Sequence, residues 1–130
     1  MEQSNDSVKK YRITVKGRFS SAHFLRGYKG KCETLHGHNY LVECTIEGKE
    51  VDGSGMLMDF NNLKNLLSEV LNELDHKTLN DLPPFKLKNP TAENIAEFIY
   101  RQIKDKLPIT YFLHIKVWET DENCAECGDI

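Results

Sequence analysis

The residues best suited to chemistry lie close together in residues 31–38 (KCETLHGH). This stretch holds a thiol and a carboxylate, followed by two histidines that flank a glycine. His36 and His38 are two residues apart, so on an extended chain both rings point to the same side. A third histidine, His23, stands thirteen residues before His36. Three neutral imidazoles with one open coordination position are a common way to hold a catalytic zinc ion.

The three histidines are also in register with the strands predicted around them. His23 is in phase with Phe19 and Ser21 at the end of the first predicted strand, so pairing with the next strand brings all three rings together. A single histidine on an apolar face is usually a packed core residue. Three in register favour a metal site instead, with zinc first among the metals that suit imidazole.

Cys32 and Glu33 precede the histidines in a loop that contains glycine and lysine. A nearby dication lowers the pKa of a thiol, and the thiolate of Cys32 can then act as a base or a nucleophile. Glu33 is a second candidate base. The alternatives are an inert, partly exposed thiol and a solvated loop carboxylate.

Further candidates stand at the ends of predicted elements. Asp75-His76 ends a predicted helix, where His76 either favours the helix dipole or, oriented by Asp75, relays a proton with Cys32. Taken alone, the sequence favours the helix terminus, and likewise a surface carboxylate at Glu119. The single CxxC from Cys124 to Cys127 is a weak zinc signal, and we interpret it as the end of a strand.

Periodicity predicts the elements that must position these residues. Alternating apolar residues predict strands, and apolar residues at helical spacing predict helices that begin after Asp59 and Thr91. The predicted strands cover residues 11–19, 40–47, 111–119 and 123–127. The order strand, strand, helix, helix, strand, strand indicates an α+β fold, with two helices on one face of a four-stranded antiparallel sheet. The other face keeps aromatic and histidine positions, so we expect it to close against neighbouring subunits.

Length and composition narrow the class of protein. A chain of 130 residues predicts one domain, residues 1–130, with residues 1–9 disordered. The net charge of −3 argues against a nucleic-acid partner. There is neither a long apolar run nor a signal-peptide pattern, so we expect no membrane association, a cytoplasmic location and reduced thiols.

Taken together, these motifs resemble the family of 6-pyruvoyltetrahydropterin synthase and 6-carboxytetrahydropterin synthase, from about Tyr11 to Cys127. The landmarks, in chain order, are residues 19–23 (FSSAH), Cys32 with residues 36–38 (HGH), residues 58–60 (MDF), 74–76 (LDH) with 79–80 (LN), 90–94 (PTAEN) and 118–120 (WET). Each motif is short, but their joint order is specific.

The resemblance implies the tunnelling fold, in which trimers close into a barrel and two trimers stack into a homohexamer. It implies that zinc is bound by three histidines: His23, His36 and His38. It also implies a proton-transfer set, partly across a subunit interface: Cys32, Asp75 and His76. Glu119 holds the guanidine-like edge of a pterin in such a site, and Thr91 adds a contact.

The substrate implied is 7,8-dihydroneopterin triphosphate. Three residues between Cys32 and His36 match the branch that forms 6-carboxy-5,6,7,8-tetrahydropterin, on the 7-deazaguanine route to queuosine; the 6-pyruvoyl branch has a longer spacing. A third branch, which makes 6-hydroxymethyl-7,8-dihydropterin for folate, has glutamate at the place of Glu33. This sequence has both residues and resembles a dual type. The rivals are a non-catalytic zinc-binding module and a pterin aldolase or epimerase.

Overall fold

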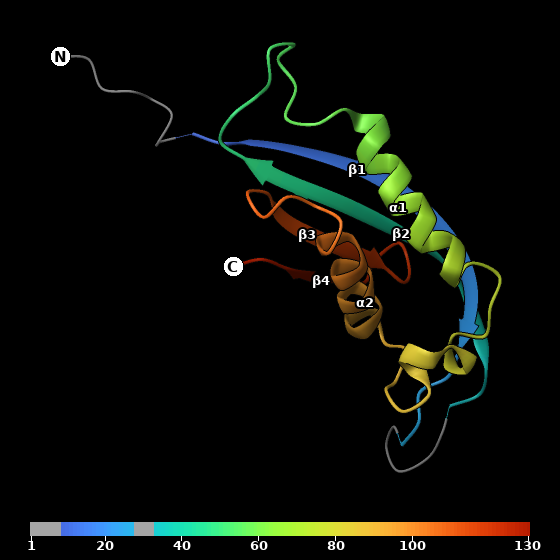
Figure 1. The fold of residues 1–130 in the computed structure, drawn as a ribbon. Coiled ribbons are helices and arrows are strands. Elements are labelled where there is room, and N and C mark those ends of the chain that lie inside the picture. The colour runs from blue at the N-terminus through green and yellow to red at the C-terminus, as the bar shows by residue number, and fades with distance from the viewer. Residues whose placement is uncertain (1–8, 28–32) are drawn as a thin grey trace.

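The computed structural model describes residues 9–27 and 33–130. Four strands form one antiparallel sheet in the order β1-β2-β3-β4, with bounds β1 Tyr11–His23, β2 His36–Gly48, β3 Phe112–Trp118 and β4 Cys124–Gly128. Helices α1 (Phe60–Leu74) and α2 (Ala92–Lys104) stand between β2 and β3 in the chain, linked by the short 3-10 helices η2 (Leu79–Asp81) and η3 (Pro83–Phe85). Figure 1 shows α1 along β1 and α2 beside β3 and β4. The predicted α+β order is confirmed.

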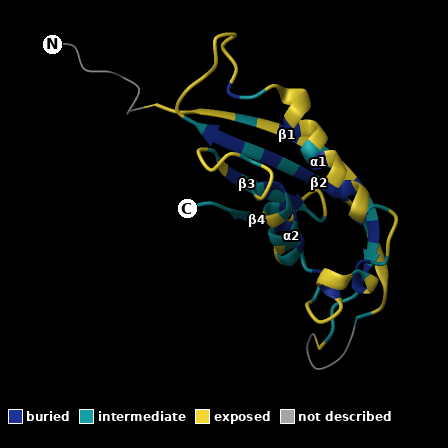
Figure 2. Ribbon diagram, viewed as in Figure 1, coloured by how far each residue is buried: buried dark blue, intermediate teal, exposed yellow. Residues whose placement is uncertain are grey.

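The core lies between the sheet and the two helices. Alternate residues of the central strands are fully buried, as the period of two predicts: Tyr40, Val42, Cys44 and Ile46 in β2, and Leu113, Ile115 and Val117 in β3. The buried stripes of α1 and α2 face them, whereas the outer helix surfaces are exposed (Figure 2). Each fully buried Leu or Ile contributes about 1.5–3 kcal/mol, so this layer dominates the stability of the fold.

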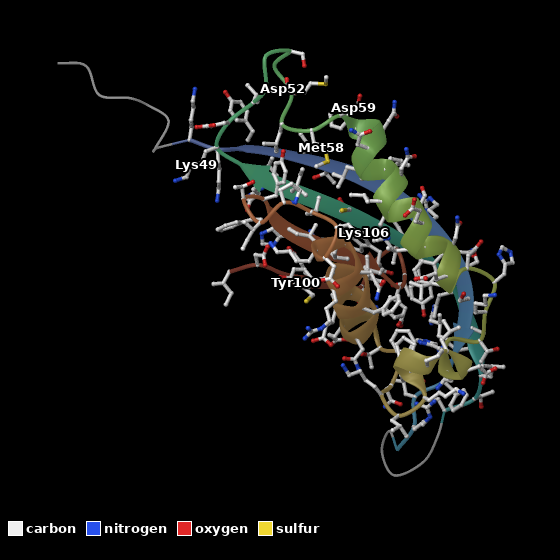
Figure 3. All side chains as sticks on the ribbon, in the orientation of Figure 1. Lys49, Asp52, Met58, Asp59, Tyr100 and Lys106 are labelled. Carbon is white, nitrogen blue, oxygen red and sulfur yellow. The ribbon has the colours of Figure 1, made fainter. Side chains whose placement is uncertain are left out.

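Both predicted helix starts are confirmed. The Asp59 carboxylate accepts a hydrogen bond from the Asn61 N–H, and the Thr91 hydroxyl oxygen accepts one from the Asn94 N–H. Figure 3 places Asp59 at the start of α1. These caps satisfy N–H groups that the first turn of a helix leaves without partners.

The first two strands are longer than the alternation of apolar residues indicated. β1 continues past Phe19 to His23, and β2 begins at His36 instead of Tyr40. Polar residues occupy these extensions, so hydropathy alone does not reveal them. In the resulting register His23 lies directly opposite His36, and Ser21 lies opposite His38.

The face of the sheet away from the helices carries no covering element among the described residues (Figure 1). It presents the predicted aromatic and histidine positions Phe112, His114 and Trp118. Phe112 is 47% exposed, whereas the Trp118 indole N–H donates to the Glu43 carboxylate. Closure of this face against neighbouring subunits remains a prediction.

Two expectations fall wholly or mainly outside the described residues. These are the disorder of residues 1–9, of which 1–8 are not described, and every role assigned to Cys32. In the part of the chain that is described, no helix combines the length and apolar character needed to cross a membrane.

Candidate metal centre

The paired ends of β1 and β2 bring three histidines together. One nitrogen from each of His23, His36 and His38 lies within 4.8 Å of the other two, and no other such group of His, Cys, Asp or Glu exists among residues 9–27 and 33–130. His23 is buried and His38 half-buried, whereas His36 is exposed in the single subunit. The convergence predicted from the spacing is therefore confirmed.

Backbone carbonyls set the orientation of two of the rings. The Nδ1 of His23 lies 2.7 Å from the Pro90 carbonyl oxygen, and the Nδ1 of His36 lies 2.8 Å from that of Thr34. A carbonyl can only accept, so each Nδ1 carries a proton and donates it, which leaves the Nε2 lone pair free. The two Nε2 atoms face each other at 3.1 Å.

The third ring, His38, supplies a buried nitrogen without a partner. Its Nε2 is shielded from solvent and has no hydrogen bond to any described residue. Burial lowers the pKa of His38 below its usual 6.5, despite the opposing charge of Glu119, so the ring is held neutral. A tetrahedral metal about 2.0–2.1 Å from its ligands sets them roughly 3.3 Å apart. The three nitrogen donors therefore fit such an ion.

A cleft of about 600 Å³ opens beside two of the histidines, His23 and His36. Glu119 and Thr91 line the same cleft. The Glu119 carboxylate is 30% exposed, with its oxygens 3.6 Å from the Nε2 of His38 and 3.9 Å from that of His23. The arrangement puts a carboxylate acceptor next to a site for a cation, so the cleft can bind a small molecule that offers N–H donors at one end and metal-binding oxygens at the other.

Asp75 and His76 do form a pair, but outside this cleft. The His76 Nδ1 lies 2.8 Å from the Asp75 Oδ2, and His76 is 83% exposed with a φ of 55°. The Ser20 N–H and the His76 imidazole both hydrogen-bond the Asp75 carboxylate and lower its pKa. His76 lines a separate shallow cavity together with Ser20, Lys77 and the metal-site histidine His38. One subunit therefore does not bring this pair into the cleft that holds Glu119.

The comparisons with known proteins identify one family. A family model described as PTPS, 6-pyruvoyl tetrahydropterin synthase, matches residues 12–129. The chain belongs to this family. It is 42% identical over 115 residues to a protein of Archaeoglobus fulgidus provisionally named 6-carboxy-5,6,7,8-tetrahydropterin synthase, covering 88% of this chain and 92% of that protein.

Two more members carry different names. The chain is 38% identical over 114 residues to the dihydroneopterin monophosphate aldolase of Pyrococcus furiosus, covering 87% of this chain and 93% of that protein. The 6-pyruvoyl tetrahydropterin synthase structure from Caenorhabditis elegans superimposes with a TM-score of 0.80 at 27% identity, covering 94% of this chain and 97% of that one. The predicted tunnelling fold of a pterin synthase is thereby confirmed, and the three names leave open which reaction this member performs.

Glu33 and the CxxC cysteines take different places in this family fold. Glu33 lines the same cleft as His23 and His36, as expected of a candidate base. Cys124 pairs with Trp118 and Cys127 with Ile115, so the two thiols project from opposite faces of β4. They do not form a joint metal site, in agreement with their interpretation as part of a strand.

Sequence reasoning missed the partners that hold the loop after His23. The side chains of Asn80 and Asn89 each make two hydrogen bonds to its backbone. The sequence motifs include Asn80 without giving it a role, and the motif of residues 90–94 begins one residue after Asn89. A signal was present, since Asn80 is an amide beside the apolar Leu79 in a connector.

Proposed function

We propose that this protein is a zinc-dependent lyase that converts 7,8-dihydroneopterin triphosphate and one water molecule to 6-carboxy-5,6,7,8-tetrahydropterin, acetaldehyde and triphosphate. The observation that carries the proposal is the convergence of His23, His36 and His38 beside Glu119. The named relative from Archaeoglobus fulgidus supports the carboxy-forming reaction. Its product feeds the 7-deazaguanine route to queuosine.

Glu119 and Thr91 anchor the pterin in this proposal. A carboxylate can accept two N–H bonds at once from the guanidine-like edge of a pterin ring. The Glu119 oxygens lie within 4 Å of the Nε2 atoms of His23 and His38. Glu119 and the histidines therefore belong to one site, in which a single ligand can contact both.

The zinc ion is held by His23, His36 and His38. Bound there, it supplies Lewis-acid polarisation of the side-chain hydroxyls, which eases proton removal. The Pro90 and Thr34 carbonyls keep two of the rings in the tautomer that presents Nε2. Such partners of metal ligands also raise the basicity of the imidazole.

Proton transfer is assigned to Cys32 and His76, with Asp75 orienting the His76 ring. The contact between His76 Nδ1 and Asp75 Oδ2 holds the ring so that Nε2 can exchange a proton. Because the pair lies outside the cleft of its own subunit, we assign it to the cleft of a neighbour. The active assembly is accordingly a homohexamer, a dimer of trimers.

A second reaction, cleavage to 6-hydroxymethyl-7,8-dihydropterin for folate synthesis, is favoured by one observation. The Glu33 carboxylate lines the cleft together with His23 and His36, so a second base is available beside the substrate. The relative named as an aldolase supports such a carbon–carbon cleavage. The 6-pyruvoyl product, for which the Caenorhabditis elegans structure is named, is the remaining alternative.

Product analysis tests the function directly. The purified protein, with its metal content measured, is incubated with 7,8-dihydroneopterin triphosphate and the pterins are identified by mass spectrometry. We expect 6-carboxy-5,6,7,8-tetrahydropterin, alone or with the hydroxymethyl product. Formation of the 6-pyruvoyl product alone contradicts the proposal. Bound zinc without turnover identifies a non-catalytic binding module instead.

A further inference from the structure

The three residues that follow His23 are bonded to side chains in place of a neighbouring strand. The Asn80 amide accepts from the Phe24 N–H at 3.0 Å and donates to the Phe24 carbonyl at 2.9 Å. The Asn89 amide does the same for Arg26, at 2.8 and 3.0 Å. A primary amide offers one acceptor and donors, like a peptide group, so each asparagine replaces one residue of a pairing strand.

The opposite edge of the same segment holds Glu33. The Leu25 N–H donates to the Glu33 carboxylate at 3.2 Å, and the Glu33 N–H donates to the Leu25 carbonyl at 3.0 Å. Leu25 bonds in the direction opposite to its two neighbours, as alternate residues of an extended chain do. Six hydrogen bonds therefore fix three residues, four from asparagines and two from Glu33.

The two asparagines are themselves held by the rigid part of the site. Asn80 is 4% exposed and belongs to η2, next to the fully buried Leu79. The Asn89 carbonyl accepts from the Asn94 side chain at 2.8 Å, and Asn89 precedes Pro90, whose carbonyl accepts from His23. The residues that hold the segment beside Glu33 are therefore connected, through Pro90, to His23 of the candidate metal site.

We propose that Asn80 and Asn89 are positioning residues that set the place of Glu33 beside the metal-site histidines. The inference rests on the role proposed above for Glu33 in forming the hydroxymethyl product. Asn80 does not line the cleft, so it acts through the backbone of Phe24 and Leu25. The hydrogen bonds of Asn80 and Asn89 fix the backbone of residues 24–26. This backbone in turn fixes the Glu33 carboxylate through the Leu25 N–H.

Asn80→Asp is the sharpest variant for a test. It keeps the size and the acceptor for the Phe24 N–H but replaces the donor with an oxygen that faces the Phe24 carbonyl. Two acceptors then oppose each other, and a buried group is left without its partner. Asn89→Asp makes the same change at a half-buried position and is used if Asn80→Asp does not fold. Because Asn89 itself lines the cleft, exchange of the Arg26 amide is then measured beside the rates.

A double-mutant cycle shows whether Asn80 acts through Glu33. The rates of both products are measured for the zinc-loaded wild type, Asn80→Asp, Glu33→Ala and the double variant. We expect Asn80→Asp to slow the hydroxymethyl product at least tenfold with one zinc retained per subunit. The double variant should be no slower than Glu33→Ala. An equal slowing by Asn80→Asp in the Glu33→Ala background overturns the proposal, as does a wild-type rate in Asn80→Asp.

Tyr100→Phe is the matched control for a general loss of stability. Tyr100 lies on α2 (Figure 3), and its hydroxyl donates to Asp129 near the C-terminal end of the chain. It lines no part of the cleft. This variant should lower Tm without slowing either product. A rate loss equal to that of Asn80→Asp at the same Tm marks the effect as structural and overturns the positioning role.

Hydrogen exchange separates failure of this inference from failure of the Glu33 assignment. In the zinc-loaded protein, the Phe24 and Leu25 amides should exchange at least tenfold faster in Asn80→Asp than in the wild type. The Ala22 amide, bonded to the Lys77 carbonyl at 2.9 Å, is the internal reference and should not change. Unchanged exchange overturns the alignment itself. If exchange is faster in Asn80→Asp but Glu33→Ala forms both products at wild-type rates, Glu33 has no catalytic role. The positioning role of Asn80 is then overturned as well.

Discussion

The Nε2 atoms of His23 and His36 lie 3.1 Å apart, directly across the pairing of β1 and β2. Both rings donate their Nδ1 proton to a backbone carbonyl, so two lone pairs face each other. Such a contact is unfavourable unless a proton or a metal ion is shared between them. The buried Nε2 of His38 adds a third donor, so the three nitrogens together can hold a cation.

We predict one zinc ion per subunit, bound through imidazole nitrogens at about 2.0–2.1 Å. His36→Ala should reduce zinc to below about a tenth of an equivalent and abolish turnover, because two imidazoles alone leave the ion poorly held. Elemental analysis of the purified variant checks this. His114→Ala, a strand histidine outside the cluster, is the matched control and should keep its zinc.

The same pair of variants supports a stability measurement. A chelator should lower Tm of the wild type and of His114→Ala, since a metal that binds only the folded state stabilises it. It should leave Tm of His36→Ala unchanged. Stoichiometric zinc in His36→Ala would show that the histidine cluster is not the metal site.

We predict a hexamer of about six times 15.0 kDa, because no element among the described residues covers the sheet face opposite the helices (Figure 1). Light scattering at micromolar concentration measures the mass. A monomer at that concentration would contradict both the assembly and a site shared between subunits.

Mixing two inactive variants tests the shared site. His36→Ala removes a metal ligand, and His76→Asn removes the imidazole while asparagine tolerates the positive φ of residue 76. Each variant alone should lose at least about a hundredfold in rate. In hexamers reassembled from equal amounts, about one site in four combines the intact halves of two subunits, so activity should return to about a quarter of wild type. Each variant taken alone through the same procedure is the control, and no recovery in the mixture places the whole site within one subunit.

We predict that Cys32 and Glu33 support different products. A thiolate and a carboxylate differ in basicity, so each is suited to removing a different proton. Cys32→Ala should abolish the 6-carboxy product and spare much of the 6-hydroxymethyl product. Glu33→Ala should spare the 6-carboxy product and reduce the 6-hydroxymethyl product to a residual rate. Both variants are compared with zinc bound, on the same substrate, by mass spectrometry. If Glu33→Ala still forms both products at wild-type yields, Glu33 is only a solvated loop residue. The enzyme is then a 6-carboxytetrahydropterin synthase without a separate role for Glu33.

We predict that Glu47 makes stability depend on acid pH. Its nearly buried carboxylate accepts from the Arg12 guanidinium, which lowers the pKa of Glu47 below its usual 4.5, with Lys10 and His114 also within 4 Å. A carboxyl with a lowered pKa in the folded state stabilises it fully above the usual value, and this contribution is lost as pH falls through the lowered value. Tm of the wild type should therefore fall more steeply below pH 4.5 than Tm of Glu47→Gln. Parallel curves for the two proteins would contradict this.

Much of the fold and the three candidate metal ligands could be predicted from local patterns. Alternation at Val42, Cys44 and Ile46 predicted the buried face of β2, and Asp59 and Thr91 predicted both helix starts. The spacing of His36 and His38 placed both rings on one face, because successive side chains of a strand alternate. These features depend on neighbours within a few residues, so the sequence by itself determines them.

Only the tertiary structure decided how the histidine rings are oriented and which candidate residues lie in the same cleft. His23 is bonded to Pro90, 67 residues away, and Asn80 and Asn89 replace a strand beside Phe24 and Arg26. Asp75 and His76 do not line the cleft of their own subunit that holds Glu119, although the family resemblance places them with Cys32 in one proton-transfer set. Contacts between residues so far apart in the chain depend on how the helices and connectors pack against the sheet, and no local periodicity encodes that packing.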